Sequence, residues 1–472
     1  MLYPLESDHW IYLYIGKRFF EGAKLYTDMF DTNAPMFFLF NGLLSQISLN
    51  IWIDRLILSL LAITSTIIFY KLTRHFLNSL VLDQVSEDNF TIVSMTIFIF
   101  FTFLTQIYGN GNTADTWGLP CMLLLIYFYF TSSIHERIYK YFVIGFLTGL
   151  IIFLKPFWLL LIIPFLVDFY MKNKTGLLSF SKGPVGLFIS GLAVIPGFWI
   201  YYFYTNNNFS DVSLIFFNYN FRYIIAAWQG YVSSPYLVLM YALLFFSVPI
   251  LIFFLWGKKR IFDPNMFYNY QQRFWAYFGF FGILLWFGSG TYNPYYLMII
   301  VPSVAISCGY WMYETSLDFS NPKTNTLLAL LVLVILFNLG FSITRTYTFV
   351  SGASQADFDN IQYASDYIYS KTSQNIDLVD LYGHGASLYI LSNRNGASRF
   401  LSVSHMLLDE RAKMGLGFTN QWINEMEKNK TKYIMTTPAM TIFVTNVKAA
   451  DYIEKNYKQV KAFGDYKVYE RK

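Results

Sequence analysis

The chain has 472 residues and a formal net charge of +5, and 55% of its residues are hydrophobic while only 13% are charged. Soluble domains carry about 25% charged residues, so this composition excludes an ordinary soluble protein and requires lipid around much of the surface. The positive charge indicates no nucleic-acid partner, because lysine and arginine fall mainly in short loops between apolar runs. The two cysteines, Cys121 and Cys308, lie inside apolar runs, which excludes a disulfide framework and a CxxC metal site.

The amino-terminal segment predicts a helix at the membrane surface. His9–Phe20 has helical spacing with one polar and one apolar face. Ser7 and Asp8 are good N-caps for this helix, and Gly22 is expected to end it. The apolar run Met36–Ile47 follows, and it is too short to span, so we expect either a half-helix or the lead-in to the first full span.

Longer apolar runs then follow, most of them near the 20 or so residues that cross a hydrocarbon core. Tyr141–Tyr170 is too long for one span, and Lys155-Pro156 at its middle predicts two short helices that enter and return to the same side. Together the runs predict a polytopic α-helical membrane protein with about ten membrane helices. The runs are Ile53–Tyr70, Phe90–Tyr108, Thr116–Thr131, Tyr141–Tyr170, Val185–Tyr204, Tyr236–Trp256, Phe274–Phe287, Tyr295–Tyr313 and Leu327–Thr344.

Loop charge predicts the orientation of these spans. One set of connections holds nearly all of the lysines and arginines, and the positive-inside bias makes that set cytoplasmic. Segment 1–52, the loop at 205–233 and everything after about residue 350 are then extracytoplasmic. An extracytoplasmic segment at the amino terminus must be translocated across the membrane. We expect a first transmembrane helix upstream of it, the alternative being translocation of a short tail by the first span.

Composition changes after Ser351, where polar residues rise and apolar runs shorten. The pattern predicts a small extracytoplasmic α/β domain. The expected organisation is therefore an acidic first loop over 1–52, a transmembrane domain over 53–350 and the α/β domain over 351–472. The expected strands are Ile376–Tyr382, Lys432–Thr436 and Tyr466–Glu470, and the expected helices are Asp357–Ser370, Asn420–Lys428 and Val447–Asn456.

Several polar residues could have a catalytic or binding role, and each could instead have a purely structural role. Asp8 and Asp31 can take a proton from a hydroxyl or hold a divalent cation, and Asp8 can instead be only a helix cap. Asp115 begins a span, and there the alternative is capping by Asp115 or Thr113. Lys155 either contacts a lipid phosphate or extends to the interface.

Two further residues could bind a ligand or have no such role. Arg222, in an aromatic and amide-rich loop, suits phosphate or sugar recognition, or else forms a structural salt bridge. His384, in "YGHG" between a strand and a helix, either helps to bind an anion at the helix amino end or has no such role.

The first loop resembles that of the GT-C membrane glycosyltransferases, in particular the protein mannosyltransferase and aminoarabinose transferase type. The likeness rests on the order Asp8, Tyr12, Gly16, Glu21-Gly22, Tyr26, Asp28, Phe30-Asp31 and Pro35, on "GFLTGLIIFLKP" at Gly145–Pro156, and on "TYNPYYLMIIVP" at Thr291–Pro302. The chain departs from the family pattern in three places: His9 replaces a second acid, Asn33 a usual lysine, and Pro294 a common histidine.

The resemblance implies a GT-C-like fold and transfer of a sugar from a polyprenyl-phosphate donor to a glycan, lipid or protein acceptor, with inversion. It implies Asp8 as the catalytic base, with Asp31 and Asp115 binding substrate or a divalent metal cation. Substrate contacts would come from Lys155, Arg222, Tyr26 and Tyr292. Two other readings stay open, namely a transporter or flippase of lipid-linked sugars, and a non-catalytic member of the same fold that scaffolds an assembly.

Overall fold

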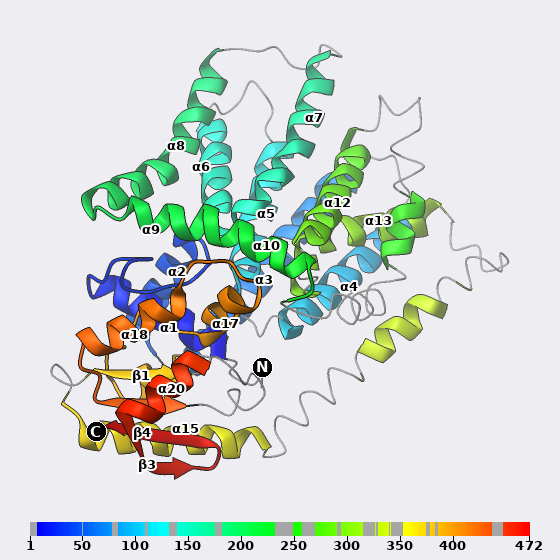
Figure 1. The fold of residues 1–472 in the computed structure, drawn as a ribbon. Coiled ribbons are helices and arrows are strands. Elements are labelled where there is room, and N and C mark those ends of the chain that lie inside the picture. Colours follow the sequence, from blue (N-terminus) through cyan, green and yellow to red (C-terminus); the bar gives the residue numbers. More distant parts are fainter. Residues whose placement is uncertain are drawn as a thin grey trace. The chain divides into compact units, whose positions relative to one another are not determined.

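A computed structural model of the chain describes most of its length (Figure 1). The described residues are 7–49, 51–77, 84–108, 112–131, 139–174, 182–231, 249–256, 270–289, 294–314, 326, 329–338, 340, 353–373, 378–382, 386–436 and 447–472.

The described chain is mostly helical, with one small sheet near its carboxyl end. The helices are α1 (Ser7–Phe20), α2 (Pro35–Ile47), α3 (Ile51–Leu77), α4 (Gln84–Tyr108), α5 (Ala114–Thr131), α6 (Tyr139–Leu154), η1 (Pro156–Leu161), α7 (Ile162–Lys174), α8 (Lys182–Thr205), α9 (Phe209–Ser213), η2 (Leu214–Tyr219), α10 (Asn220–Trp228), α12 (Tyr270–Gly288), η4 (Pro294–Ile300), α13 (Val301–Glu314), α15 (Ala353–Lys371), α16 (Ser387–Leu391), α17 (Val403–Arg411), α18 (Phe418–Lys428) and α20 (Val447–Asn456). The strands are β1 (Val379–Tyr382), β2 (Tyr433–Thr436), β3 (Tyr457–Phe463) and β4 (Tyr466–Arg471).

The chain divides into two compact units. One unit, which we call the mixed unit, comprises Met1–Asp54, Tyr202–Ser233 and Thr344–Lys472. The other, the helical unit, comprises Arg55–Tyr201 and Ser234–Ile343. The mixed unit therefore joins three segments that lie far apart in the sequence, a grouping that the sequence analysis did not predict.

Aromatic and aliphatic side chains fill the core of the helical unit. Phe69 of α3 stacks on Phe98 of α4 with ring centroids 4.1 Å apart. Helices α6 and α8 approach closely through glycines, since a Cβ added at Gly145 would lie 2.0 Å from the carbonyl oxygen of Phe188. Such close approach of small residues is the usual way for apolar helices to pack in lipid. Gly145 belongs to the glycine-rich sequence singled out above, and helix packing explains its presence there.

The long apolar run Tyr141–Tyr170 is broken at Lys155, as predicted. Helix α6 ends at Leu154, Lys155 is extended with φ −152° and ψ 96°, and η1 begins at Pro156. Proline at this position lacks the N–H that would continue the helix and restricts the residue before it. The prediction that the two halves return to one side of a membrane stays a prediction.

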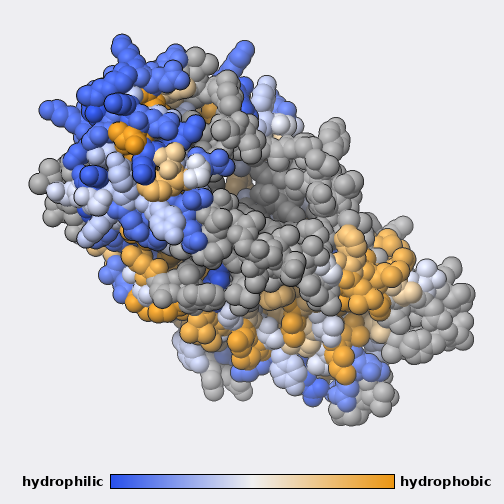
Figure 2. All heavy atoms as spheres, turned by 90° about the horizontal axis from the view of Figure 1, so that it is seen from below, coloured by the Kyte–Doolittle hydropathy of each residue, from blue (hydrophilic) through white to orange (hydrophobic). Residues whose placement is uncertain are grey.

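Three helical stretches within the described residues are long and apolar enough to cross a membrane: Ile53–Leu77, Gly183–Thr205 and Tyr296–Tyr313. Pro35–Ile47, the run that we expected to be a half-helix or a lead-in, is a separate shorter apolar helix. Large hydrophobic side chains are exposed along Ile53–Leu77 and Gly183–Thr205, whereas Tyr296–Tyr313 is mostly buried. Figure 2 shows apolar residues at the surface of the face that it draws. The predicted number of about ten membrane helices stays a prediction, and most of the run Tyr236–Trp256 lies outside the described residues.

The mixed unit is built on the crossing of α1 and α2 (Figure 1). A Cβ added at Gly16 would lie 2.3 Å from the backbone nitrogen of Gly42, so both positions need glycine for the helices to meet. Helix α1 ends near Gly22, which has φ +94° as expected for a helix-ending glycine. Asp8 lies in the first turn of α1.

The sheet of the mixed unit has the strand order β1-β2-β4-β3. Strands β1 and β2 are parallel, while β4 is antiparallel to both β2 and β3. Three strands and three helices were predicted close to their observed positions. Strand β3 was missed because its less exposed residues, Tyr457, Val460 and Phe463, recur at every third position, so the alternation that marks a strand is absent.

Candidate functional site

Asp31 lies in the turn between α1 and α2 and is only 6% exposed. Its Oδ1 accepts hydrogen bonds from the backbone nitrogen of Asn33 (2.8 Å) and from Asn33 Nδ2 (2.9 Å). Tyr26, buried and held at φ +69°, donates its hydroxyl to the carbonyl oxygen of Asn33 at 2.8 Å. The side chains of Tyr26 and Asn33 thus fix the turn that presents Asp31 ahead of Pro35.

Electrostatics make Asp31 unusual for a carboxylate. Burial raises the pKa of Asp31 from 3.8 to about 6, and the charge of Asp8 raises it further, while the hydrogen bonds from Asn33 oppose the shift. The influence of Asp8 on Asp31 means that the two predicted site acids act on one another within the mixed unit. A carboxyl group with such a pKa exchanges its proton near neutral pH, as a general acid or base must.

The residue next to Asp8 is also ionisable and buried. His9 Nε2 lies 2.6 Å from Oδ2 of Asp54, at the start of α3, and both side chains are almost fully buried. His9 replaces the second acid of the family pattern that the first loop resembles, and here the histidine is paired with an acid. Asp54 was missed by the sequence analysis, although an acid at the start of an apolar span is a recognisable signal.

The carboxyl-terminal segment contributes side chains to the surroundings of Asp31. The hydroxyl of Tyr219, at the end of η2, lies 2.7 Å from Nδ1 of His405 in α17. Burial raises the pKa of Tyr219 well above its usual value, and the charge of Asp31 adds to that shift. Phe30 packs edge-on to the rings of both Tyr219 (5.4 Å) and His405 (5.2 Å). The sequence carried no signal that would place His405 beside the first loop.

Arg222 lies on α10, one turn after Tyr219, and is half-buried. Within the described part of the chain it has no ion-pair partner, so the alternative of a structural salt bridge finds no support there. A half-buried guanidinium without a carboxylate is suited to an anionic ligand.

Asp115 and Lys155 form the second cluster, in the helical unit. Lys155 Nζ lies 2.6 Å from both carboxylate oxygens of Asp115, whose side chain is only 2% exposed. The ammonium also lies 3.8 Å from the ring centroid of Tyr296. The break in the helix at Lys155 aims its side chain at the first turn of α5. The capping of α5 comes from Thr113, whose hydroxyl accepts from the backbone nitrogen of Thr116 at 3.3 Å.

A divalent metal cation would need several acidic or histidine ligands. The described residues contain no group of three or more histidine, cysteine, aspartate or glutamate side chains placed to hold one. Oδ1 of Asp31 already accepts two hydrogen bonds, and both oxygens of Asp115 face an ammonium group. These carboxylate oxygens, already occupied by hydrogen-bond donors, do not fit a resident metal ion. The expected divalent cation stays a prediction.

The remaining predicted residues are placed as follows. Tyr292 and His384 lie outside the described residues. Asp8, Tyr26, Asp31 and Arg222 belong to the mixed unit, and Asp115 and Lys155 to the helical unit. The structure thus brings Asp8 near Asp31 in the mixed unit and pairs Lys155 with Asp115 in the helical unit.

No protein-family model and no curated protein match the chain in sequence. Several solved structures match it in fold, among them two of one protein. The crystal structure of ArnT from Cupriavidus metallidurans bound to undecaprenyl phosphate has a TM-score of 0.58 and 11% identity, over 99% of this chain and 94% of that one. The apo structure of the same protein has a TM-score of 0.56 and 10% identity, over 99% and 93%. The chain therefore has an ArnT-like fold, which confirms the fold that the resemblance of the first loop implied.

Proposed function

We propose that this protein is a membrane glycosyltransferase that moves a sugar from a polyprenyl-phosphate carrier to an acceptor on the extracytoplasmic face. The observation that carries the proposal is the fold, which matches nearly all of a protein crystallised with undecaprenyl phosphate. The apolar helices support a location in the cell membrane. An extracytoplasmic position for the mixed unit follows from loop charge.

The acidic first loop supports chemistry rather than transport alone. Asp8 would act as the general base and accept the proton of the acceptor hydroxyl as its oxygen forms a bond to the anomeric carbon. The bond between that carbon and the phosphate oxygen breaks, and the polyprenyl phosphate leaves with the electron pair. Attack opposite the phosphate inverts the anomeric configuration.

Each of the two clusters then has its own role. In the mixed unit, Asp31 and Tyr26 would contact substrate, and Arg222 would bind an anionic group. In the helical unit, Lys155 would contact the lipid phosphate. Its ammonium group has three N–H donors, and Asp115 accepts from only two of them. Developing charge on the phosphate favours such a contact in the transition state.

The test is transfer of label from a panel of radiolabelled polyprenyl-phosphate sugars to a membrane extract by the purified protein, with and without EDTA. Asp8→Asn keeps the shape of the side chain and removes the base, so we expect transfer to fall by about a hundredfold or more. The matched control is Asp28→Asn. That acid lies in the same loop but is exposed, and its carboxylate accepts from the backbone nitrogen of Lys24, which an asparagine oxygen also does.

The outcomes separate the alternatives. Transfer by wild type and by Asp28→Asn, but not by Asp8→Asn, supports the proposal. Full transfer by Asp8→Asn overturns the role of Asp8. Donor binding without transfer in wild type favours a flippase or a non-catalytic protein. Loss of transfer in EDTA would support the predicted metal cation.

A further inference from the structure

The carboxyl-terminal segment holds the residue next to Asp31 directly. The backbone nitrogen of Phe30 donates to the carbonyl oxygen of Arg399 at 2.7 Å. Phe30 and Phe400 form an isolated parallel β-bridge, and their rings pack with centroids 5.4 Å apart. The main chain just before Asp31 is therefore attached to a segment nearly 370 residues further along.

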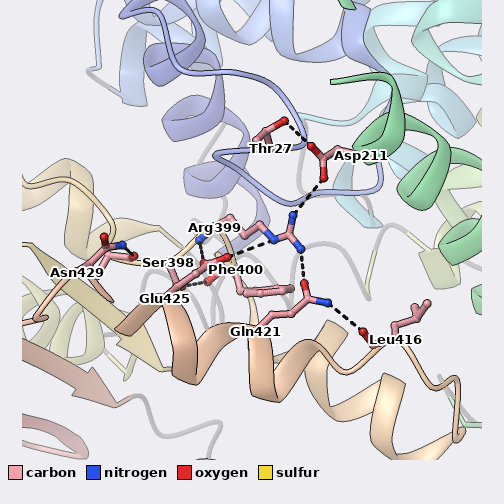
Figure 3. Close-up of polar contacts among 10 residues, drawn as sticks. Thr27, Asp211, Ser398, Arg399, Phe400, Leu416, Gln421, Glu425 and Asn429 are labelled. Carbon is pink, nitrogen blue, oxygen red and sulfur yellow. Dashed lines mark hydrogen bonds and ion pairs between the residues drawn. The ribbon is translucent and has the colours of Figure 1, made fainter. Parts of the chain in front are cut away.

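The side chain of Arg399 makes a second connection (Figure 3). Its guanidinium lies 3.5 Å from Oδ1 of Asp211 in α9 and 3.5 Å from Oε1 of Glu425 in α18, and it donates to Oε1 of Gln421. The backbone nitrogen of Arg399 donates to Oε2 of Glu425 at 2.9 Å. The side chain of Arg399 is only 13% exposed, so these interactions are poorly screened by solvent.

Asp211 carries this connection back to the first loop. Its Oδ2 accepts a hydrogen bond from Thr27 Oγ1 at 2.7 Å (Figure 3). Arg399 thus reaches the loop at two points: at Thr27 through Asp211, and at Phe30 through its own carbonyl oxygen. Both points lie within the four residues before Asp31, so movement of Arg399 is expected to shift the chain that leads into that carboxyl group.

We propose that Arg399 is a positioning residue for the Asp31 turn. It couples the carboxyl-terminal segment to the first loop and holds Asp31 in its buried setting. The proposal rests on the proposed function, since it assigns the carboxyl-terminal segment a part in sugar transfer. Positioning of this kind matters because small displacements of reacting groups lower rates steeply.

Arg394 provides a matched control. It is buried, with 5% exposure, and lies only five residues before Arg399. Its guanidinium donates to Thr372 Oγ1 at 2.7 Å and to the carbonyl oxygen of Tyr369 at 3.0 Å. These partners all belong to the carboxyl-terminal segment. Arg394→Gln should therefore disturb that segment without releasing the first loop.

The first experiment is hydrogen exchange with mass spectrometry on the full chain in detergent, which requires no substrate. In Arg399→Gln, we expect exchange over residues 24–34 to rise by about tenfold or more, while Arg394→Gln leaves those residues near wild type. Unchanged protection of 24–34 in Arg399→Gln overturns the proposal. If Arg399→Gln does not fold, Thr27→Val removes one hydrogen bond of the same connection and should raise exchange in the same peptides. Unchanged protection there overturns the proposal equally.

The second experiment is the sugar-transfer assay. We expect Arg399→Gln to lower kcat by about tenfold to a hundredfold with little change in donor KM. Arg399→Lys, which keeps the positive charge beside Asp211 and Glu425, should recover most of the loss. Equal losses in Arg399→Gln and Arg394→Gln, or no rescue by lysine, overturn the positioning role. If wild type shows no transfer, the proposed function and the catalytic part of this inference fail together, whereas the exchange experiment still decides whether Arg399 holds the loop.

Discussion

Replacing Lys155 by methionine is expected to leave Asp115 as an unpaired, buried carboxylate. Both oxygens of Asp115 lie 2.6 Å from Lys155 Nζ, and the side chain of Asp115 is 2% exposed. Methionine is apolar, unbranched and of similar length, so it keeps most of the packing beside Tyr296 and removes only the charge.

The burial of the two partners sets the size of the effect. Breaking a buried ion pair by removing one partner costs about 3–5 kcal/mol, because the other charge is left uncompensated. Asp115→Asn should cost less, about 1–3 kcal/mol, since Lys155 is 15% exposed and its long side chain can reach water. In the double variant no charge is left unpaired, so its loss should be smaller than the sum of the single losses by up to about 3 kcal/mol.

The assay is equilibrium unfolding of the purified chain in mixed micelles with a rising fraction of denaturing detergent, followed by tryptophan fluorescence. All four proteins of the cycle are compared at one pH and ionic strength. A loss below about 1 kcal/mol in Lys155→Met, the value typical of solvated ion pairs, would refute the argument from burial. Strictly additive losses would show that the two groups do not interact.

Two further predictions concern a pKa and a close helix contact. Because the folded-state pKa of Asp31 is raised from 3.8 to about 6, its burial destabilises the protein increasingly as pH rises through that window. Asp31→Asn should therefore stabilise the fold by about 3 kcal/mol at pH 7 and by almost nothing near pH 4, and an equal effect at both values in pH-dependent unfolding would contradict this. Gly145→Ala places a methyl group 2.0 Å from the carbonyl oxygen of Phe188 and should cost about 1–3 kcal/mol. At Gly197, also helical but with nothing within 4 Å, alanine should be neutral or stabilise by up to about 1 kcal/mol, and similar melting temperatures for the two variants would disprove the packing argument.

Local patterns were enough for several element ends and for one strand, but not for helices α9 and α10, which lie in the stretch 205–233 that was predicted as a loop. The break at Lys155-Pro156, the end of α1 near Gly22 and the strand at Tyr433–Thr436 follow from proline and glycine chemistry and from short apolar runs. Strand β3 escaped prediction because its less exposed residues recur at every third position rather than every second one.

The chain sequence by itself determined the apolar, mostly helical class and the small carboxyl-terminal sheet, because composition and periodicity act over a few residues. It also singled out Asp8, Asp31, Asp115 and Lys155 as candidate site residues. Only the tertiary structure decided which distant groups meet. The contacts of Lys155 with Asp115, and of Phe30 with Arg399, join residues 40 and 369 positions apart. No local pattern encodes such pairs, because they form when whole elements pack and bury polar groups that must then find partners.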